Sequence, residues 1–481
     1  MIRILRVFIF TLLLILTYVQ GISQNIQKSV SDSGQKNSTY FKSKDQSLSI
    51  VKINLSGNQR TKGFIVLREL PFKTGDSLTE TELQIQLTLA KQQLMNTSLF
   101  VDVNVYIALR INQSLIINVD IKERWYLFPL PYFRLVDRNF NQWWVEQNRS
   151  LERVNYGIKF TQNNFSGRND NLDIWLITGY TNQITLRYNL PFIDKKLKSG
   201  INVGFISATQ KEINYATGDN KQLFFKQEEI TKQILRLDFT YSFRPDVKKR
   251  HYFRISYNDE KIADTVLIIN PLYYPDKKTR LTFFDFNYQF KYYNVDFLAY
   301  PSKGFLFEGN IYRRGLDDIT GLWQFSARAI YILPITKKTF LHMEGMFIAK
   351  TPSNSYFVNE HIFGYGYFQM RGLEYNVVDG MQGASLKTTL HKELFSFIFN
   401  NPFPSKTHDK IPFRIFLKAY GDLGYGYTPT PNISNTLNNK LLKTWGFGID
   451  IISIYDFVFK IEYSFNQLGV DGLYLKSRND F

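Results

Sequence analysis

The sequence predicts an all-β transmembrane antiparallel barrel of about 16 strands that follows one small α+β domain. The first observation is strict alternation of apolar and polar side chains, as in Leu235, Leu237, Phe239, Tyr241 and Phe243 with polar residues between them. The second is the aromatic content, with 42 Phe and 30 Tyr among 481 residues. Such a content is expected where rings form girdles at membrane interfaces.

Recurring strands of about ten residues have apolar faces that no set of buried helices could cover, so lipid is the expected partner. Backbone groups inside hydrocarbon must pair within the protein, so the strands must close on themselves and the polar face lines a lumen. An even strand count returns both barrel ends to one side. Four long connections, at 137–153, 211–229, 261–278 and 351–383, are predicted on the other, extracellular side.

The N-terminus predicts export. Two arginines precede an apolar run from Val7 to Leu16, and this run is shorter than the ~20 residues of a membrane-spanning helix. Residues 1–23 are therefore predicted to be a signal peptide, and the polar segment 24–46 a flexible tether. A signal peptide and a barrel pattern together place the protein in a Gram-negative outer membrane.

Composition excludes several chemistries. The chain contains no cysteine, which removes disulfides, thiolate metal sites and cysteine nucleophiles. The net charge is +17, but the basic residues are scattered over turns such as 194–198 and 248–250, so no nucleic-acid partner is predicted. Basic loops could instead meet the phosphates of lipopolysaccharide and other outer-membrane lipids. The five histidines lie far apart in the sequence, so no metal site, catalytic residue or cofactor is predicted.

Residues 47–123 are predicted to fold separately, in the order strand, helix, helix, strand, strand. Thr79 and Glu82 have the spacing of a capping box that starts the second helix. Spacings of three and four place one group of apolar residues on the core face of that helix. The group consists of Leu83, Leu87, Ala90 and Leu94.

This order of elements and two short motifs resemble the POTRA domain of outer-membrane assembly and secretion proteins. The residues that match the POTRA pattern are Gly57, Asn58, Arg60, Thr61, Asn96, Leu99 and Phe100. The chain is identified as having a single POTRA copy at 47–123, with the barrel at 124–481.

The longest connection contains Arg371, Gly372 and Leu373, and a later strand contains Asp422 and Gly424 in a Tyr-Gly-Asp-Leu-Gly segment. The alternation of that strand turns the Asp422 carboxylate toward the lumen. A guanidinium in the connection could form charge-assisted hydrogen bonds to such a carboxylate and hold the loop in place. The alternative is an exposed arginine with a solvated partner, worth roughly 0–1 kcal/mol.

The two motifs, at this separation, resemble those of the BamA and TamA superfamily, which includes two-partner-secretion transporters. In that superfamily an Arg-Gly-aromatic loop folds back into the barrel, and the resemblance implies that Arg371 meets Asp422. The sequence departs from the pattern at Leu373, where the family usually has Phe.

The ends of the barrel predict a weak seam. Pro129 and Pro131 lie two apart on the first strand, so their missing amide donors belong to one edge. The last strand is short, beginning at Gly472 and approaching Phe481. Such a junction could open sideways and pair with incoming strands. Alternatively, the prolines only mark the linker that enters the barrel.

The expected function is non-enzymatic assistance in the insertion, assembly or translocation of other proteins at the outer membrane. The resemblance implies client polypeptides as partners, received by the POTRA domain and the seam, and accessory lipoproteins beside them. Two alternatives remain open. One is a transporter that passes a single substrate through the lumen, as in two-partner secretion, and the other is a passive diffusion pore.

Overall fold

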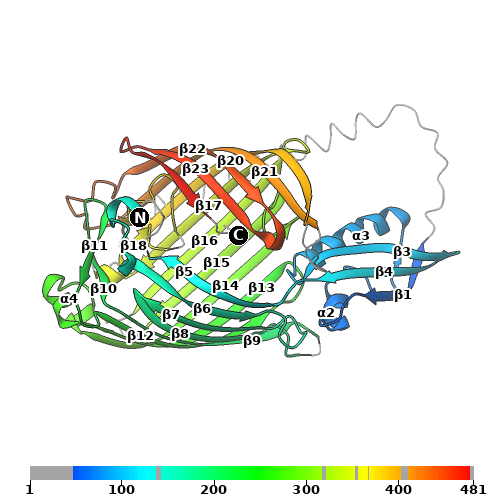
Figure 1. Cartoon of the computed structure of the whole chain (residues 1–481), viewed down its shortest axis with the longest axis horizontal. Helices are drawn as coiled ribbons and strands as arrows, with labels where there is room; N and C mark the ends of the chain where they lie inside the picture. Colours follow the sequence, from blue (N-terminus) through cyan, green and yellow to red (C-terminus); the bar gives the residue numbers. More distant parts are fainter. Residues whose placement is uncertain are drawn as a thin grey trace.

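The computed structural model describes residues 47–136, 142–194, 196–316, 321–352, 356–366, 368–401 and 410–476. The predicted signal peptide at 1–23, the predicted tether at 24–46 and Phe481 lie outside these ranges. Over the described residues the chain forms a small α+β domain beside one large curled sheet (Figure 1). In the same residues, no helix is long and apolar enough to cross a membrane.

The N-terminal domain has the predicted order of elements, with one additional two-residue strand. Its elements are β1 (Leu48–Ser56), α2 (Gly63–Arg68), β2 (Ser77–Leu78), α3 (Glu80–Met95), β3 (Phe100–Ile111) and β4 (Ser114–Glu123). The four strands lie in the order β2-β1-β4-β3, and β1 runs parallel to β4. The two helices connect these strands.

Local chemistry explains α3 and its packing. The Thr79 side chain accepts from the Glu82 amide, and the Glu82 carboxylate accepts from the Thr79 amide, which confirms the predicted capping box. The predicted core face of α3 is buried against the sheet. Gly57 turns the chain at the end of β1 with a positive φ of 82°, and a Cβ there would collide with the carbonyl oxygen of Ile121.

Sixteen strands of the described chain form one antiparallel sheet, which confirms the predicted fold class. They are β5 (Leu127–Leu135), β6 (Val154–Gln162), β7 (Asn171–Gly179), β8 (Thr181–Leu190), β9 (Ser199–Gln210), β12 (Lys232–Phe243), β13 (Lys249–Ile262), β14 (Arg280–Val295), β15 (Gly304–Arg314), β16 (Leu322–Pro334), β17 (Thr339–Thr351), β20 (Gln382–Asn400), β21 (Lys410–Tyr427), β22 (Leu441–Ile452), β23 (Val458–Asn466) and β24 (Asp471–Lys476).

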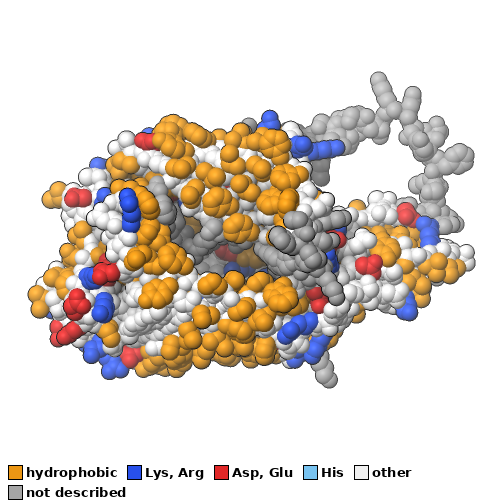
Figure 2. Space-filling model, in the orientation of Figure 1, with side chains coloured by type: hydrophobic (Ala, Val, Ile, Leu, Met, Phe, Trp, Pro, Cys, Tyr) orange, Lys and Arg blue, Asp and Glu red, His pale blue; other side chains and the backbone are white. Residues whose placement is uncertain are grey.

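The outer face of this sheet is apolar. On β12, Leu237 and Phe239 are exposed on the outside, whereas Asp238 between them is buried and forms a two-fold hydrogen bond with Arg187 of β8. Figure 2 shows hydrophobic side chains over the barrel wall, with charged side chains mainly toward the two ends. This is the surface that a membrane barrel presents to lipid.

The two edge strands of the barrel do not share a ladder. Hydrogen-bonded pairing runs without interruption from β5 to β24, but no register joins β24 to β5 in the described part of the chain. Within the described residues, the junction of β5 and β24 is therefore the place where backbone pairing does not close the sheet. Figure 1 shows β5 and β23 on the near side of the curled sheet, with the junction between them.

The longest hairpin of the barrel, β20–β21, continues beyond its neighbours toward the N-terminal domain. Pairing of β20 with β17 ends at Lys392, while pairing with β21 continues to Asn400. A bulge between Glu393 and Phe395 shifts the register there. After the bulge, Phe395 and Phe397 pair with residues on the lipid-facing side of β21, so the apolar outer face extends with the hairpin.

The barrel end far from the N-terminal domain is covered by short elements (Figure 1). They are β10 (Glu212–Gly218), β11 (Lys221–Lys226), α4 (Asp264–Ile269), β18 (His361–Phe363), β19 (Val378–Asp379), the 3-10 helices η2 (Leu151–Arg153), η3 (Pro275–Lys277) and η4 (Phe357–Asn359), and the π-helix η1 (Gln142–Glu146). The 3-10 helix η5 (Ile454–Asp456) lies in the turn between β22 and β23. Segment 211–229, expected to be a plain connection, thus contains a hairpin.

Candidate functional site

The inner wall of the barrel is built from alternate residues of β21. Leu417 and Leu423 are exposed on the outside, whereas Lys418 and Asp422 face inward and are buried. Asp422 is only 1% exposed. A carboxylate buried this deeply needs both a cation and hydrogen-bond donors, because an unpaired buried charge is strongly destabilising.

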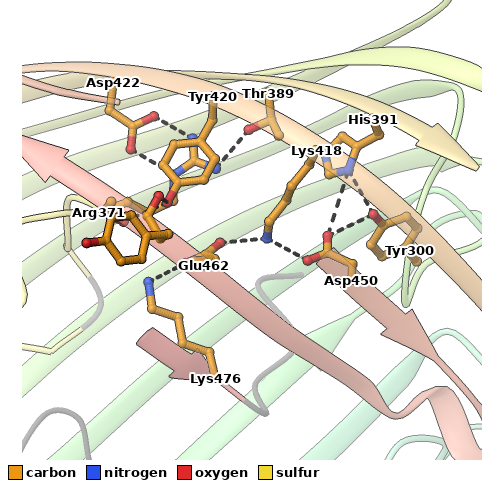
Figure 3. Close-up of polar contacts among 12 residues, drawn as sticks. Tyr300, Arg371, Thr389, His391, Lys418, Tyr420, Asp422, Asp450, Glu462 and Lys476 are labelled. Carbon is orange, nitrogen blue, oxygen red and sulfur yellow. Dashed lines mark hydrogen bonds and ion pairs between the residues drawn. The ribbon is translucent and has the colours of Figure 1, made fainter. Parts of the chain in front are cut away.

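Arg371 supplies that cation from the segment between β17 and β20, which returns into the barrel. Its Nε donates to Asp422 Oδ2 at 2.8 Å, and Nη2 donates to the other carboxylate oxygen. Nη1 donates to Thr389 on β20 at 2.9 Å, and the guanidinium lies 3.9 Å from the centre of the Tyr420 ring. The contact implied by the resemblance is present, and all three guanidinium nitrogens have partners (Figure 3).

The residues around Arg371 explain how the segment fits so closely. Gly372 has a φ of 79°, and a Cβ there would lie 3.0 Å from the carbonyl oxygen of Phe465, so a larger residue would push the segment away from the wall. Gly424 leaves room for the Met370 side chain. Leu373 is 5% exposed and packs in an apolar cluster. Leu373, where the sequence departs from the Arg-Gly-aromatic pattern, is thus accommodated by apolar packing.

A second set of ion pairs crosses the same wall (Figure 3). Lys418 lies 2.5 Å from Asp450 and 2.6 Å from Glu462, and Asp450 also accepts a hydrogen bond from Tyr300. Lys476 of β24 pairs with Glu462 at 2.8 Å.

Lys476 also reaches Glu374 at 2.9 Å, three residues after Arg371. The returning segment is thus bound to β21 through Arg371 and to the last barrel strand through Glu374. Neither Lys476 nor Glu374 lies in a recognisable sequence pattern, so this contact could not be predicted from the sequence.

The predicted seam residues lie as follows. Pro129 and Pro131 are on β5, opposite Phe160 and Ile158 of β6, and both are exposed. Gly472 is on β24, where a Cβ would approach the Tyr474 hydroxyl to 2.9 Å.

The expected POTRA residues divide into two groups. Gly57, Leu99 and Phe100 serve the turn and core of the N-terminal domain, and Asn58 donates to the Thr61 carbonyl at 3.2 Å. The second group, Arg60, Thr61 and Asn96, contacts turns of the barrel.

Arg60 donates to the carbonyl oxygens of Asn164 and Phe165 at 2.9 and 2.8 Å. The Asn164 amide in turn donates to the Thr61 hydroxyl at 2.9 Å. Asn96 accepts from the Leu298 amide at 3.1 Å. These contacts fix the N-terminal domain at the barrel mouth.

A buried ion pair that no sequence pattern predicted also joins the two domains. Glu69, at the end of α2 and 2% exposed, accepts from Arg244 through both oxygens at 2.7 and 2.8 Å. Arg68 also donates to Glu69 at 2.8 Å. Burial disfavours the ionised carboxyl, but the two arginines outweigh it and keep the pKa of Glu69 below its usual value. On the other side of the mouth, Arg124 pairs with Asp456 at 3.1 Å.

Asn220, at the tip of the β10–β11 hairpin, connects the segments that cover the barrel end far from the N-terminal domain. Its amide groups bond to Asn435 and Thr436, each at 3.0 Å, and its side-chain oxygen accepts from the Leu437 amide at 2.9 Å. Its carbonyl accepts from Val377 of the returning segment. Asp219 and Asn220 both have positive φ, as a two-residue hairpin turn requires, so this pair was a usable sequence signal.

Two histidines expected to lie apart are in fact neighbours. The rings of His342 on β17 and His391 on β20 have centroids 6.2 Å apart. His391 is hydrogen-bonded to Tyr300 at 2.8 Å. No group of three or more potential metal ligands occurs among the described residues.

Comparison with known sequences identifies the N-terminal domain. Residues 49–124 match the sequence model of the POTRA family, described as a surface antigen variable number repeat. This domain is a POTRA domain. A search of curated proteins found no similar sequence.

The solved structures that are similar to the chain include three outer-membrane proteins. BamA from Haemophilus ducreyi lacking POTRA domains 1–3 is 15% identical, with a TM-score of 0.47 over 89% of this chain and 83% of that one. CdiB from Escherichia coli is 10% identical, with a TM-score of 0.46 over 96% of each chain. CdiB from Acinetobacter baumannii is 13% identical, with a TM-score of 0.45 over 89% of this chain and 74% of that one. At these values the likenesses carry no functional argument.

The Arg371–Asp422 contact predicts a loop lock. Arg371→Ala leaves Asp422 buried without its cation, at a cost of about 3–5 kcal/mol. We expect the segment 352–381 to become protease-sensitive and the barrel to unfold at lower temperature. The exposed pair Arg280–Asp259 supplies the control, since Arg280→Ala should change neither property. Unchanged protease sensitivity and stability in Arg371→Ala would rule out the lock.

The Glu69 contact predicts pH-dependent docking. Its pKa in the docked state is below the usual 4.5, so Glu69 stabilises docking above that pH and loses this effect as pH falls through the lowered pKa. The distance between labels on α3 and β13 should therefore stay constant from about pH 7 to 5 and increase only below about pH 4.5. Glu69→Gln should weaken docking already at pH 7, whereas Glu80→Gln, in an exposed pair, should not. A pH profile shared by all three proteins would contradict this assignment.

Proposed function

We propose that the chain is a Gram-negative outer-membrane protein of the BamA and TamA superfamily that helps to insert, assemble or translocate other polypeptides. The POTRA domain lies in the periplasm, and the covered end of the barrel is extracellular. No chemical catalysis, nucleotide or cofactor is assigned. The observation that supports this proposal is a POTRA domain joined to a 16-stranded barrel whose returning segment binds Asp422 through Arg371.

Client polypeptides are the proposed partners, with outer-membrane lipids, including lipopolysaccharide, around the barrel and accessory lipoproteins on the periplasmic side. The POTRA sheet ends in β2 and β3, and β3 is the longer of these edge strands. An edge strand presents unpaired backbone groups, so an extended client segment can add to it as a further strand.

Insertion is favoured over passage through the lumen by the contrast between the seam and the interior. The edge strands β5 and β24 share no register in the described residues, and β5 contains two prolines that lack amide donors. The interior, by comparison, is crossed by the Arg371 segment and covered at the extracellular end. A client strand therefore meets less resistance at the seam than a chain threading the lumen.

Transport and diffusion remain the rival functions. A two-partner-secretion-type transporter would have to displace the Arg371 segment and the extracellular cover for each substrate. A passive pore would need a water path past the ion pairs of the inner wall, and its POTRA domain would have no role. Neither rival explains why β5 and β24 share no ladder in the described residues.

Depletion of the protein separates these functions. We predict that many different barrel proteins decrease in the outer membrane, because an insertase serves several clients. Quantitative proteomics of outer-membrane fractions measures this directly. Loss of one secreted protein alone would support the transporter instead, and altered uptake of small solutes alone would support the pore.

Cross-linking tests the seam. The chain has no native cysteine, so Leu130→Cys on β5 and Leu473→Cys on β24 can be joined selectively by a bifunctional maleimide. The joined protein should lose client insertion and regain it when a cleavable linker is cut. A control pair on β15 and β16, such as Phe305→Cys with Tyr331→Cys, joins strands that are already paired and should have no effect. Full activity of the joined seam would refute lateral opening.

A further inference from the structure

A cavity of about 280 Å³ lies between the POTRA domain and the inner wall of the barrel. This volume is just below the range of roughly 300–1,000 Å³ that is typical of ligand pockets. Helix α3 contributes Gln92 and Gln93 to its lining, and the start of β13 and the preceding turn contribute Arg250, Arg244 and Lys248. We call this cavity the junction chamber.

The junction chamber has more positive than negative charge. Its lining contains three cations, Arg244, Lys248 and Arg250, but one carboxylate, Glu69, which is already engaged by Arg244. Arg68 adjoins the chamber and adds a fourth cation. Burial, followed by repulsion from Arg244, lowers the pKa of Arg68 to about 10, as expected in a region of excess positive charge.

Two of these cations have free capacity to bind. The Nε groups of Arg244 and Arg250 are buried and have no hydrogen-bond partner among the described residues. Arg250 lies 5.4 Å from the centre of the Tyr293 ring and attracts the Glu69 carboxylate, which Arg244 already binds. Lys248 lines the chamber and has no ion-pair partner in the described part of the chain. Buried donors without partners are costly, so an oxyanion that accepts from them would be bound favourably.

The chamber also holds an unpartnered acceptor. Gln93 Oε1 is buried without a donor in the described structure. Neutral amides dominate the remaining polar lining, which includes Gln92, Asn96, Asn169, Asn189 and Asn294. A fully deprotonated inorganic anion such as sulfate offers no donor to Gln93, whereas a peptide N–H does. An extended peptide bearing a carboxylate therefore satisfies both kinds of unpartnered group.

We propose that the junction chamber binds an acidic segment of a polypeptide, with the carboxylate at Arg250 and the backbone near Gln93. This inference rests on the proposed function and names the chemistry of the client that the barrel mouth receives. A lipid phosphate is disfavoured because the chamber lies on the inner side of the wall. Arg250 alternates with outward-facing residues on β13, so it points away from the lipid-facing surface.

Peptide binding to the full-length protein in detergent tests the proposal. The probe is a fluorescent 12-residue peptide of alternating Asp and Ser, compared with its Asn analogue, and the readout is fluorescence anisotropy. We expect the acidic peptide to bind at least about tenfold more tightly, since a hydrogen bond to a charged group is worth roughly 1.5–3 kcal/mol. Equal affinity for the two peptides would overturn the proposal.

A matched pair of variants distinguishes binding in the junction chamber from nonspecific attraction of the acidic peptide to basic residues. Arg250→Gln should weaken binding of the acidic peptide by about tenfold. Lys249→Gln removes the same charge one residue away, but Lys249 is exposed and on the opposite face of β13, so binding should change by less than about twofold. If both variants weaken binding equally, the attraction is not specific to the chamber and the proposal fails.

Protection of a single introduced thiol from maleimide labelling tests which ligand occupies the junction chamber. Maleimide labelling of Gln93→Cys should be slowed by the acidic peptide but not by inorganic phosphate or by phosphatidylglycerol vesicles. Protection by phosphate or vesicles without protection by the peptide would overturn the proposal. If the peptide fails to bind but depletion still removes many barrel proteins, only the chamber assignment is lost. If depletion alters solute uptake alone, the proposed function fails whatever the peptide does.

Discussion

Inside hydrocarbon, a backbone amide without a partner is strongly unfavourable, because no water is present to replace the missing hydrogen bond. This constraint explains most of the structure. It requires one continuous ladder, which the sheet provides from β5 to β24, and it turns alternate side chains toward lipid. The remaining side chains then face a narrow interior, where Asp422, Glu462 and Asp450 become buried carboxylates that need cations.

The cations that pair with these buried carboxylates also hold the loops in place. Arg371 comes from the long segment after β17 and binds a carboxylate of β21, while Lys476 of the last strand binds Glu374 of the same segment. A single returning loop thus bridges the wall and the end of the barrel. The edge that this loop holds is also the place where the ladder is interrupted. In the described residues, β24 is held by its pairing with β23 and by the contact of Lys476 with the loop.

The sequence predicted the features that depend on residues close to one another in the chain or on recognisable motifs. Alternation on β12 and the capping box at Thr79 involve near neighbours, so each could be recognised locally, and Arg371 and Asp422 were found because both lie in motifs. The contact of Glu69 with Arg244 joins residues 175 positions apart, and neither residue belongs to a pattern. Only the folded arrangement of α2 and the barrel turns brings them together.

The missed hairpin at Asp219 and Asn220 has a different cause. Its turn signal was present in the sequence, but the flanking strands alternate weakly because they cover the barrel end rather than cross the membrane. At the junction of β5 and β24, the two prolines predicted a weak seam, but the sequence could not predict whether the two strands pair at all. Period-two patterning requires pairing somewhere, but it does not say whether the first and last strands pair with each other.

Site-specific quenching along β12 tests the central claim most directly. Single cysteines at Arg236, Leu237, Phe239 and Thr240, labelled with a fluorophore, would be compared in vesicles that contain brominated lipid or aqueous iodide. The account predicts that brominated lipid quenches the labels at Leu237 and Phe239, and that it leaves those at Arg236 and Thr240 unquenched. Uniform quenching by iodide, or a protein that stays monodisperse without detergent, would contradict a barrel with its apolar face in the membrane.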